Sequence, residues 1–135
     1  LPEGGRVWTF EVNDEMEDFT RPWLEGSQFA DRINFIIGDA NVEAPRLGIT
    51  FDMVFIDGDK RTYLETYEMA LSVTRSGGYI LADNTLWDGH VIDRSYDNDR
   101  QTSGIERFND FVATDRRVER VILPLRDGLT IIRKL

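Results

Sequence analysis

Two apolar runs that each end in a carboxylate lie on either side of a segment with helical spacing. The first, FDMVFID, ends at Asp57, and the second, GGYILADN, ends at Asp83 with Asn84 next to it. Continuous apolar runs are typical of buried parallel strands, and the apolar side chains in residues 60–75 recur at helical spacing. A strand, a helix and a second strand predict a right-handed crossover between neighbouring parallel strands. Asp57, Asp83 and Asn84 would then meet at the carboxyl edge of the sheet, where open α/β sheets bind ligands.

The rest of the chain predicts a mostly parallel sheet with helices on both faces. Four strands are expected, at residues 6–12, 32–37, 51–56 and 79–82. Helices are expected after Asn13 or Asp14, from about Lys60, and over residues 103–114. The polar residues 88–102 predict a long loop over the sheet edge. The β-branched runs on either side of Arg126-Asp127-Gly128 predict a closing antiparallel hairpin. This order of elements favours the α/β class.

Composition excludes several classes of function. The 135 residues carry 16 Lys and Arg against 25 Asp and Glu, a net charge of −9, which argues against nonspecific binding to nucleic acid or to an acidic membrane surface. The absence of cysteine excludes disulfides, thiolate metal sites and cysteine nucleophiles. No apolar run approaches the length of a membrane span, and no signal peptide is visible, so we expect a cytoplasmic protein.

The three polar residues at the predicted sheet edge suit a hard metal ion. Two carboxylates and an amide oxygen, from Asp57, Asp83 and Asn84, are ligands for Mg²⁺ or Ca²⁺ rather than zinc. Acids at strand ends are also common turn formers and helix caps. Two of them on adjacent strands, together with the amide, favour a metal site, which could hold a substrate oxygen and lower its pKa.

Lys60 and Arg61 open the helix that follows Asp57. Cations are disfavoured at a helix N-terminus by the macrodipole, so their position indicates another role, such as binding an anion or removing a proton. A lysine beside a metal and an acidic hydroxyl could act as general base. The alternative is a solvated lysine that pairs with Asp59 or Glu65.

Two other strand ends carry residues that could contact a ligand. Glu11 ends the first strand, where an acid can accept hydrogen bonds from ribose hydroxyls; the alternative is a surface acid. Gly38-Asp39-Ala40 ends the next strand, where small residues let a ligand approach the backbone; the alternative is a plain turn.

The aromatic residues divide by position. Trp87 follows the proposed metal ligands and could stack on a planar substrate. Trp8 and Trp23 are expected to be packing residues. His90, the single histidine, lies without a visible Ser-His-Asp arrangement and is interpreted as a loop residue.

With these residues assembled, the chain resembles the S-adenosylmethionine-dependent O-methyltransferases of the caffeoyl-CoA and catechol type. The matching blocks are VFIDGDKRTY, GGYILADNTLWDGHV, the segment from residue 104 to 134 and, more loosely, GGRVWTFEVNDE. The resemblance implies a Rossmann-like fold and metal-assisted methyl transfer to a hydroxyl of a catechol-like acceptor.

The resemblance also implies a role for each matching position. Asp57, Asp83 and Asn84 match the divalent-metal ligands, Lys60 the proposed base, and Trp87 an aromatic at the acceptor pocket. On the cofactor side the expected residues are Glu11, Gly38, Ala40, Asp57, Gly58 and Asp59. The expected cofactors are S-adenosylmethionine and Mg²⁺, with Ca²⁺ or Mn²⁺ as alternatives, and the expected partners are a small hydroxylated acceptor and a second copy in a homodimer.

One feature of the family has no counterpart in these residues. The glycine-rich loop that wraps the methionine end of the cofactor, and the strand before it, lie upstream of the resemblance. We therefore expect residues 1–135 to form a single, partial methyltransferase domain that binds S-adenosylmethionine weakly or not at all. Two alternatives stay open: a catalytically silent α/β association module, and a metal-dependent phosphatase, which Arg61 disfavours because the DxDxT pattern requires threonine there.

Overall fold

A computed structural model describes residues 2–135, which divide into two compact units. The first unit ends at Leu47 and the second comprises Gly48–Leu135. The described residues contain no helix of the length and apolar character that a membrane span requires.

The first unit contains a two-stranded parallel sheet. Strand β1 (Val7–Glu11) pairs with β2 (Ile33–Ile37), with Glu11 opposite Ile37 at the carboxyl edge. Helix α1 (Glu17–Glu25) follows a 3₁₀ turn, η1 (Asp14–Met16), that Asn13 caps, and helix α2 (Ala40–Arg46) is capped by Asp39. A second 3₁₀ turn, η2 (Ala30–Arg32), precedes β2.

One aromatic prediction in this unit was wrong. Helix α1 places Arg21 over the ring of Phe35 in β2, 5.4 Å from its centroid. Residues two positions apart point to opposite sides of a helix, so Trp23 lies on the outward side and is 74% exposed rather than packed.

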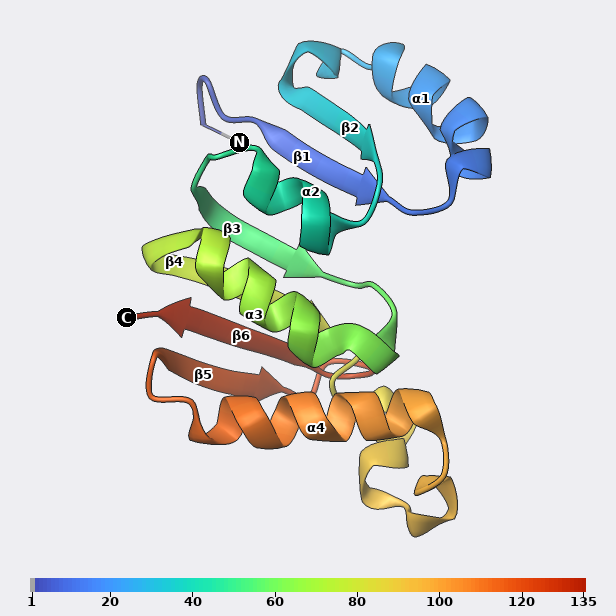
Figure 1. The fold of residues 1–135 in the computed structure, drawn as a ribbon, viewed down its shortest axis with the longest axis vertical. Helices are drawn as coiled ribbons and strands as arrows, with labels where there is room; N and C mark the ends of the chain where they lie inside the picture. Colours follow the sequence, from blue (N-terminus) through green and yellow to red (C-terminus); the bar gives the residue numbers. More distant parts are fainter. Residues whose placement is uncertain (1) are drawn as a thin grey trace. The chain divides into compact units, whose positions relative to one another are not determined.

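The second unit contains a four-stranded mixed sheet covered on one face by two helices (Figure 1). Its elements are β3 (Phe51–Ile56), η3 (Lys60–Thr62), α3 (Tyr63–Val73), β4 (Thr74–Asp83), η4 (Trp87–Ile92), η5 (Arg94–Tyr96), α4 (Arg100–Thr114), β5 (Val118–Leu123) and β6 (Leu129–Lys134). The strand order is β3-β4-β6-β5, with β3 and β4 parallel and the other pairs antiparallel. The predicted crossover, closing hairpin and α/β class are therefore confirmed.

The core of the second unit fills the space between the sheet and these two helices. Tyr63 and Tyr67 of α3 pack edge-on against Phe108 of α4, with ring centroids 5.5 and 5.8 Å apart. All three rings are fully buried, as are Ile80 and Ile132 of the sheet beneath them. This packing holds the amino-terminal end of α3 against the carboxyl end of β3.

Two boundaries differ from the sequence predictions. Strand β4 begins at Thr74 rather than residue 79, because α3 ends at Val73. Gly78 is pressed against the backbone of β3, where an added Cβ would lie 2.9 Å from the carbonyl oxygen of Asp52. Glycine therefore permits this close approach where the register of β3 and β4 shifts between Phe51 and Met53.

The predicted long loop at residues 88–102 is largely ordered into short helical turns. Asp93 and Asp99 accept hydrogen bonds from the backbone N–H groups of Ser95 and Thr102, which starts η5 and α4. Aspartate is a favoured cap for this reason, so the polar composition encoded helix starts rather than an unstructured loop.

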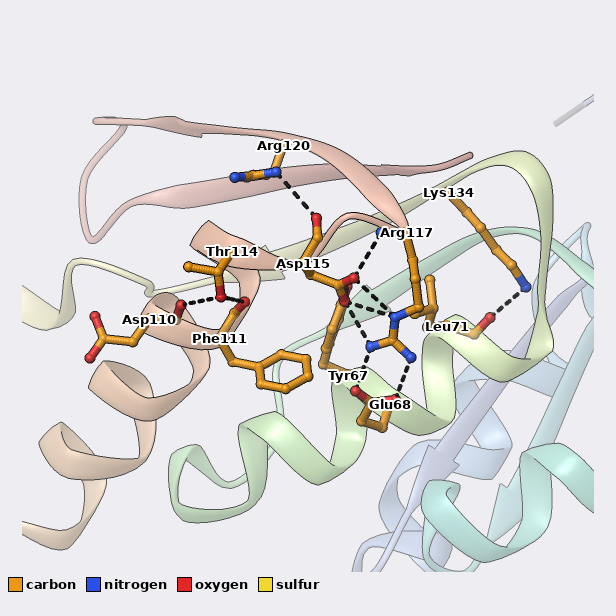
Figure 2. Close-up of polar contacts among 10 residues, drawn as sticks. All are labelled: Tyr67, Glu68, Leu71, Asp110, Phe111, Thr114, Asp115, Arg117, Arg120 and Lys134. Atoms are coloured by element: carbon orange, nitrogen blue, oxygen red, sulfur yellow. Dashed lines mark hydrogen bonds and ion pairs between the residues drawn. The ribbon is translucent and has the colours of Figure 1, made fainter.

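A polar cluster joins α3, α4 and β5 at the amino-terminal edge of the sheet (Figure 2). The buried carboxylate of Asp115 accepts a hydrogen bond from the Tyr67 hydroxyl at 2.8 Å and from Arg117 Nη2 at 2.7 Å. Arg117 also pairs with Glu68 of α3. On β6, Lys134 Nζ donates to the carbonyl oxygens of Leu71 and Thr74 at the end of α3.

Candidate active site

The carboxyl ends of β3 and β4 bring two carboxylates to one edge of the second unit's sheet. Ile56 and Ala82 are the last paired residues of the two strands. Asp57 and Asp83 each follow by one position, and the parallel register places them side by side. Asn84 comes next in the chain, and its backbone N–H donates to Oδ1 of Asp83 at 2.8 Å.

Lys60 lies beside these acids and is only 5% exposed. Its ammonium donates to Oδ1 of Asp57 at 3.0 Å and to the hydroxyl of Tyr63 at 2.7 Å. The interpretation of a solvated lysine paired with Asp59 or Glu65 is therefore wrong. Lysine is rarely buried unless it is paired, and here Asp57 supplies the opposite charge.

Tyr63 joins the two strand ends to Lys60. Its hydroxyl lies 2.7 Å from the carbonyl oxygen of Asp83 and 3.1 Å from that of Ile56. Burial raises the pKa of Tyr63 well above its ordinary value, and the negative charges of Asp57 and Asp83 raise it further. The phenol therefore stays protonated and can accept from Lys60 while donating to a strand carbonyl.

Asp59 and Arg61 form a separate pair at the start of η3. The Asp59 carboxylate accepts from the backbone N–H of Arg61 at 3.0 Å and forms an ion pair with its guanidinium. Hydrogen bonds from Arg61 lower the pKa of Asp59. The unfavourable position of Arg61 in the first turn is thus explained by a local ion pair, and Gly58 beside it leaves open space where a side chain would be.

Aromatic side chains follow the candidate ligands. Lys60 Nζ lies 6.0 Å from the centroid of the Trp87 ring. Trp87 makes an edge contact with His90, and His90 stacks on Tyr96 with ring centroids 3.6 Å apart. The wall beside Lys60 is therefore aromatic, and it includes the histidine interpreted as a loop residue.

The remaining predicted residues lie in the first unit. Glu11 and Gly38 meet at the carboxyl edge of β1 and β2, where the N–H of Gly38 donates to the carbonyl oxygen of Glu11 at 2.8 Å. Oε1 of Glu11 accepts from the N–H of Asn13. Ala40 is the first residue of α2. Glu11 and Gly38 thus lie together at one edge of this sheet, and a role of these three residues in binding the cofactor stays a prediction.

The donor set of the second unit fits a hard divalent cation. Asp57, Asp83 and Asn84 supply oxygen atoms, and half of the Asp57 side chain is open to solvent. Within residues 2–135 no three His, Asp or Glu side chains form a metal-binding group, so the predicted site depends on the amide of Asn84. A metal at this position stays a prediction.

Two residues of this site were missed by sequence reasoning. Tyr63 falls three positions after Lys60, the spacing that places two side chains on one helix face, and this was the signal for it. Gly104 of α4 touches the backbone of Lys60 so closely that an added Cβ would lie 2.2 Å from its carbonyl oxygen. No local pattern in the sequence indicates that contact.

Comparison with known proteins gives one consistent family. A family model described as O-methyltransferase matches residues 1–135. Tricin synthase 2 of Oryza sativa subsp. japonica is 35% identical over 147 residues, which cover all of this chain and 50% of the relative. Caffeoyl-CoA O-methyltransferase 1 of Zea mays is 34% identical over 149 residues, covering all of this chain and 57% of the relative. The chain therefore spans about half the length of these relatives.

Solved structures share the same architecture. The O-methyltransferase from Bacillus cereus in complex with SAH superimposes with a TM-score of 0.88 at 31% identity, covering 98% of this chain and 64% of that one. The O-methyltransferase TomG from Streptomyces achromogenes, in complex with SAM, gives a TM-score of 0.88 at 26% identity, covering 99% and 64%.

Proposed function

Because the chain belongs to the O-methyltransferase family, we propose that it serves the transfer of a methyl group from S-adenosylmethionine to a hydroxyl of a small, catechol-like acceptor with two adjacent oxygens. Besides family membership, one observation of the structure supports this proposal. Asp57 and Asp83 lie side by side at the ends of parallel strands, with the buried Lys60 bonded to Asp57. This arrangement combines oxygen ligands with a group that can exchange a proton.

Asp57, Asp83 and Asn84 would hold the divalent cation, with Mg²⁺ preferred and Ca²⁺ or Mn²⁺ as alternatives. A cation bound there would supply positive charge that favours the ionised form of an acceptor hydroxyl. Asp83 is the last residue of β4 and Asp57 follows the last residue of β3, so both acids are anchored at strand ends.

Lys60 would exchange a proton with the acceptor hydroxyl. An ammonium has three donors, and the bonds to Asp57 and Tyr63 use two of them. To act as the base, Lys60 would first give up its third proton to solvent. As a neutral amine it would keep its bonds to Asp57 and Tyr63, and its lone pair could then take the proton of an acceptor hydroxyl on the Trp87 side. Tyr63, which stays protonated, would fix the position of Lys60 without competing for the proton.

Trp87 would form one wall of the acceptor pocket, where an aromatic ring can stack on a planar substrate. The residues proposed for cofactor binding are those that the family resemblance implies: Glu11, Gly38, Ala40, Asp57, Gly58 and Asp59. Two of the similar solved structures hold SAH and SAM, which supports S-adenosylmethionine as the donor.

Magnesium-dependent stability tests the metal site directly. We expect MgCl₂ to raise the melting temperature of the wild-type chain, since a ligand at 100 times its Kd stabilises by about 2.7 kcal/mol. Asp83→Ala should abolish the shift. Asp88→Asn is the matched control, because Asp88 is exposed, follows the site closely and has a positive φ that asparagine tolerates.

Methyl transfer tests the reaction. Labelled S-adenosylmethionine and a catechol are incubated with the chain and with any longer polypeptide that contains it. Methylated catechol that requires magnesium and is lost in Asp83→Ala supports the proposal. Two results together would favour the catalytically silent association module instead. The melting temperature would be the same with and without magnesium, and neither the chain nor a longer polypeptide that contains it would transfer a methyl group.

A further inference from the structure

The turn between β5 and β6 holds the segment that follows β4. The carbonyl oxygen of Asp127 accepts from the backbone N–H groups of Leu86 at 2.7 Å and Trp87 at 3.3 Å. The carbonyl oxygen of Gly128 accepts from the N–H of Thr85 at 3.1 Å. Three successive residues after Asn84 are therefore bonded to two residues that lie roughly 40 positions later in the chain.

Gly128 permits this close approach. An added Cβ would lie 2.5 Å from Cγ of Leu86 and 2.8 Å from its backbone nitrogen, and the φ of Gly128 is +85°. A side chain at this position would push the segment away and strain the backbone. The turn and the segment thus form one rigid unit at the sheet edge.

The Asp127 side chain reaches the predicted metal ligand itself. Nδ2 of Asn84 lies 3.4 Å from Oδ2 of Asp127 and donates to it. An ionised carboxylate only accepts hydrogen bonds, so the nitrogen end of the Asn84 amide must face Asp127. The oxygen end, which is the end that can ligate a cation, is then the one left for the metal site.

We propose that Asp127 is a positioning residue that orients the amide of Asn84 so that its oxygen faces the cation. The inference rests on the proposed function, because it assumes a cation held by Asp57, Asp83 and Asn84. Outer partners of this kind fix the orientation of metal ligands, and their loss weakens metal affinity about 10- to 100-fold.

Titration with MnCl₂ tests the inference without an activity assay. Free Mn²⁺ is followed by electron paramagnetic resonance in the wild-type chain and in variants whose folding is checked by circular dichroism. We expect Asp127→Ala to raise the Kd about 10- to 100-fold and Asp127→Asn to stay within about threefold, because an Asn oxygen can still accept from Asn84. Arg126→Asn, in the same turn, should bind like the wild type.

Each other outcome has a distinct meaning. Equal binding by Asp127→Ala and the wild type, with loss of binding in Asp83→Ala, overturns the inference and leaves the proposed function intact. Binding lost in Asp127→Asn as fully as in Asp83→Ala overturns it too, because Asp127 would then be a ligand. If Asp127→Ala does not fold, Asp127→Ser replaces it, because the shorter side chain also loses the contact with Asn84 and should show the same increase in Kd; a Ser variant that binds like the wild type overturns the inference. A wild-type chain that binds no Mn²⁺ overturns both the metal site and the inference.

Discussion

Replacement of Asp115 by asparagine should produce a loss of stability that depends on pH. The Asp115 side chain is 4% exposed and accepts hydrogen bonds from Tyr67, from the backbone of Arg117 and from the Arg117 guanidinium. The hydrogen bonds from Arg117 are the main cause that lowers the pKa of Asp115 from 3.8 to about 2. Asparagine keeps the size of the side chain and removes the charge.

The magnitude follows from the pKa difference between the folded and unfolded states. One pKa unit corresponds to about 1.4 kcal/mol, so a shift from 3.8 to about 2 contributes roughly 2 kcal/mol to the free energy of unfolding. Because the folded pKa is the lower one, this stabilisation is fully present above pH ~4 and is lost as the pH falls toward ~2. At the acid end, the protonated Asp115 side chain and the asparagine amide that replaces it should be nearly equivalent.

Urea unfolding followed by circular dichroism, at pH values from about 7 to about 2.5, measures this difference. We expect Asp115→Asn to cost about 2 kcal/mol at pH ~7 and progressively less below pH ~4. The control is Glu119→Gln, which removes an exposed pair with Arg133 and should cost less than about 1 kcal/mol. A loss for Asp115→Asn that is constant over the whole pH range would refute the reasoning, as would no loss at neutral pH.

Two further substitutions test how Lys60 is held and used. Gly104→Ala should destabilise the chain by about 1–3 kcal/mol, because the new methyl group collides with the backbone of Lys60. In a longer polypeptide that contains the chain and transfers methyl groups, the same change should lower kcat more than it changes KM. Gln101→Ala, at an exposed position of the same helix, should leave stability, kcat and KM unchanged. Lys60→Met keeps a long side chain in the buried site but removes the ammonium. It should lower kcat in the same polypeptide about 10²- to 10⁴-fold. If a folded Lys60→Met variant keeps activity within about tenfold of the wild type, Lys60 is not the base.

The sequence predicted the parts of the site that depend on strand direction. Apolar runs ending at Asp57 and Asp83 indicated two buried strands, and the helical spacing between them indicated a parallel crossover. Parallel strands must end at the same edge, so the meeting of the two carboxylates followed from topology alone. The hairpin around Asp127-Gly128 was equally predictable, because its turn residues and β-branched flanks are local signals.

The partners of individual side chains were not predictable in the same way. Lys60 has carboxylates at 57, 59 and 65 within reach along the chain, and the sequence does not rank them. The choice of Asp57 depends on burial, which arises when α4 packs over η3 through Gly104. Arg61 forms its ion pair with Asp59 instead, because the Arg61 side chain remains exposed on the outer side of the same turn.

The prediction of a loop was wrong for a related reason. Polar residues at 88–102 indicate exposure, but exposure does not imply lack of structure. Short helices on a surface need only capped ends and a few anchoring contacts, which Asp93, Asp99 and the stacked rings of His90 and Tyr96 supply. The polar composition of residues 88–102 indicates only that the segment is exposed. Its helical turns are indicated by the capping patterns Asp-x-Ser at Asp93 and Asp-x-x-Thr at Asp99.

The site therefore rests on three backbone contacts between residues far apart in sequence, each with a different physical origin. Strand register aligns Asp57 with Asp83, a glycine on α4 lets η3 carry Lys60 toward Asp57, and the Asp127-Gly128 turn fixes the segment that bears Asn84 and Trp87. Two of the three depend on glycine, because only a residue without Cβ allows backbones to approach so closely. Substitutions at Gly104 and Gly128 should consequently disturb the site more than truncation of larger residues on the exposed faces of the same elements, although neither glycine contributes an atom that could react.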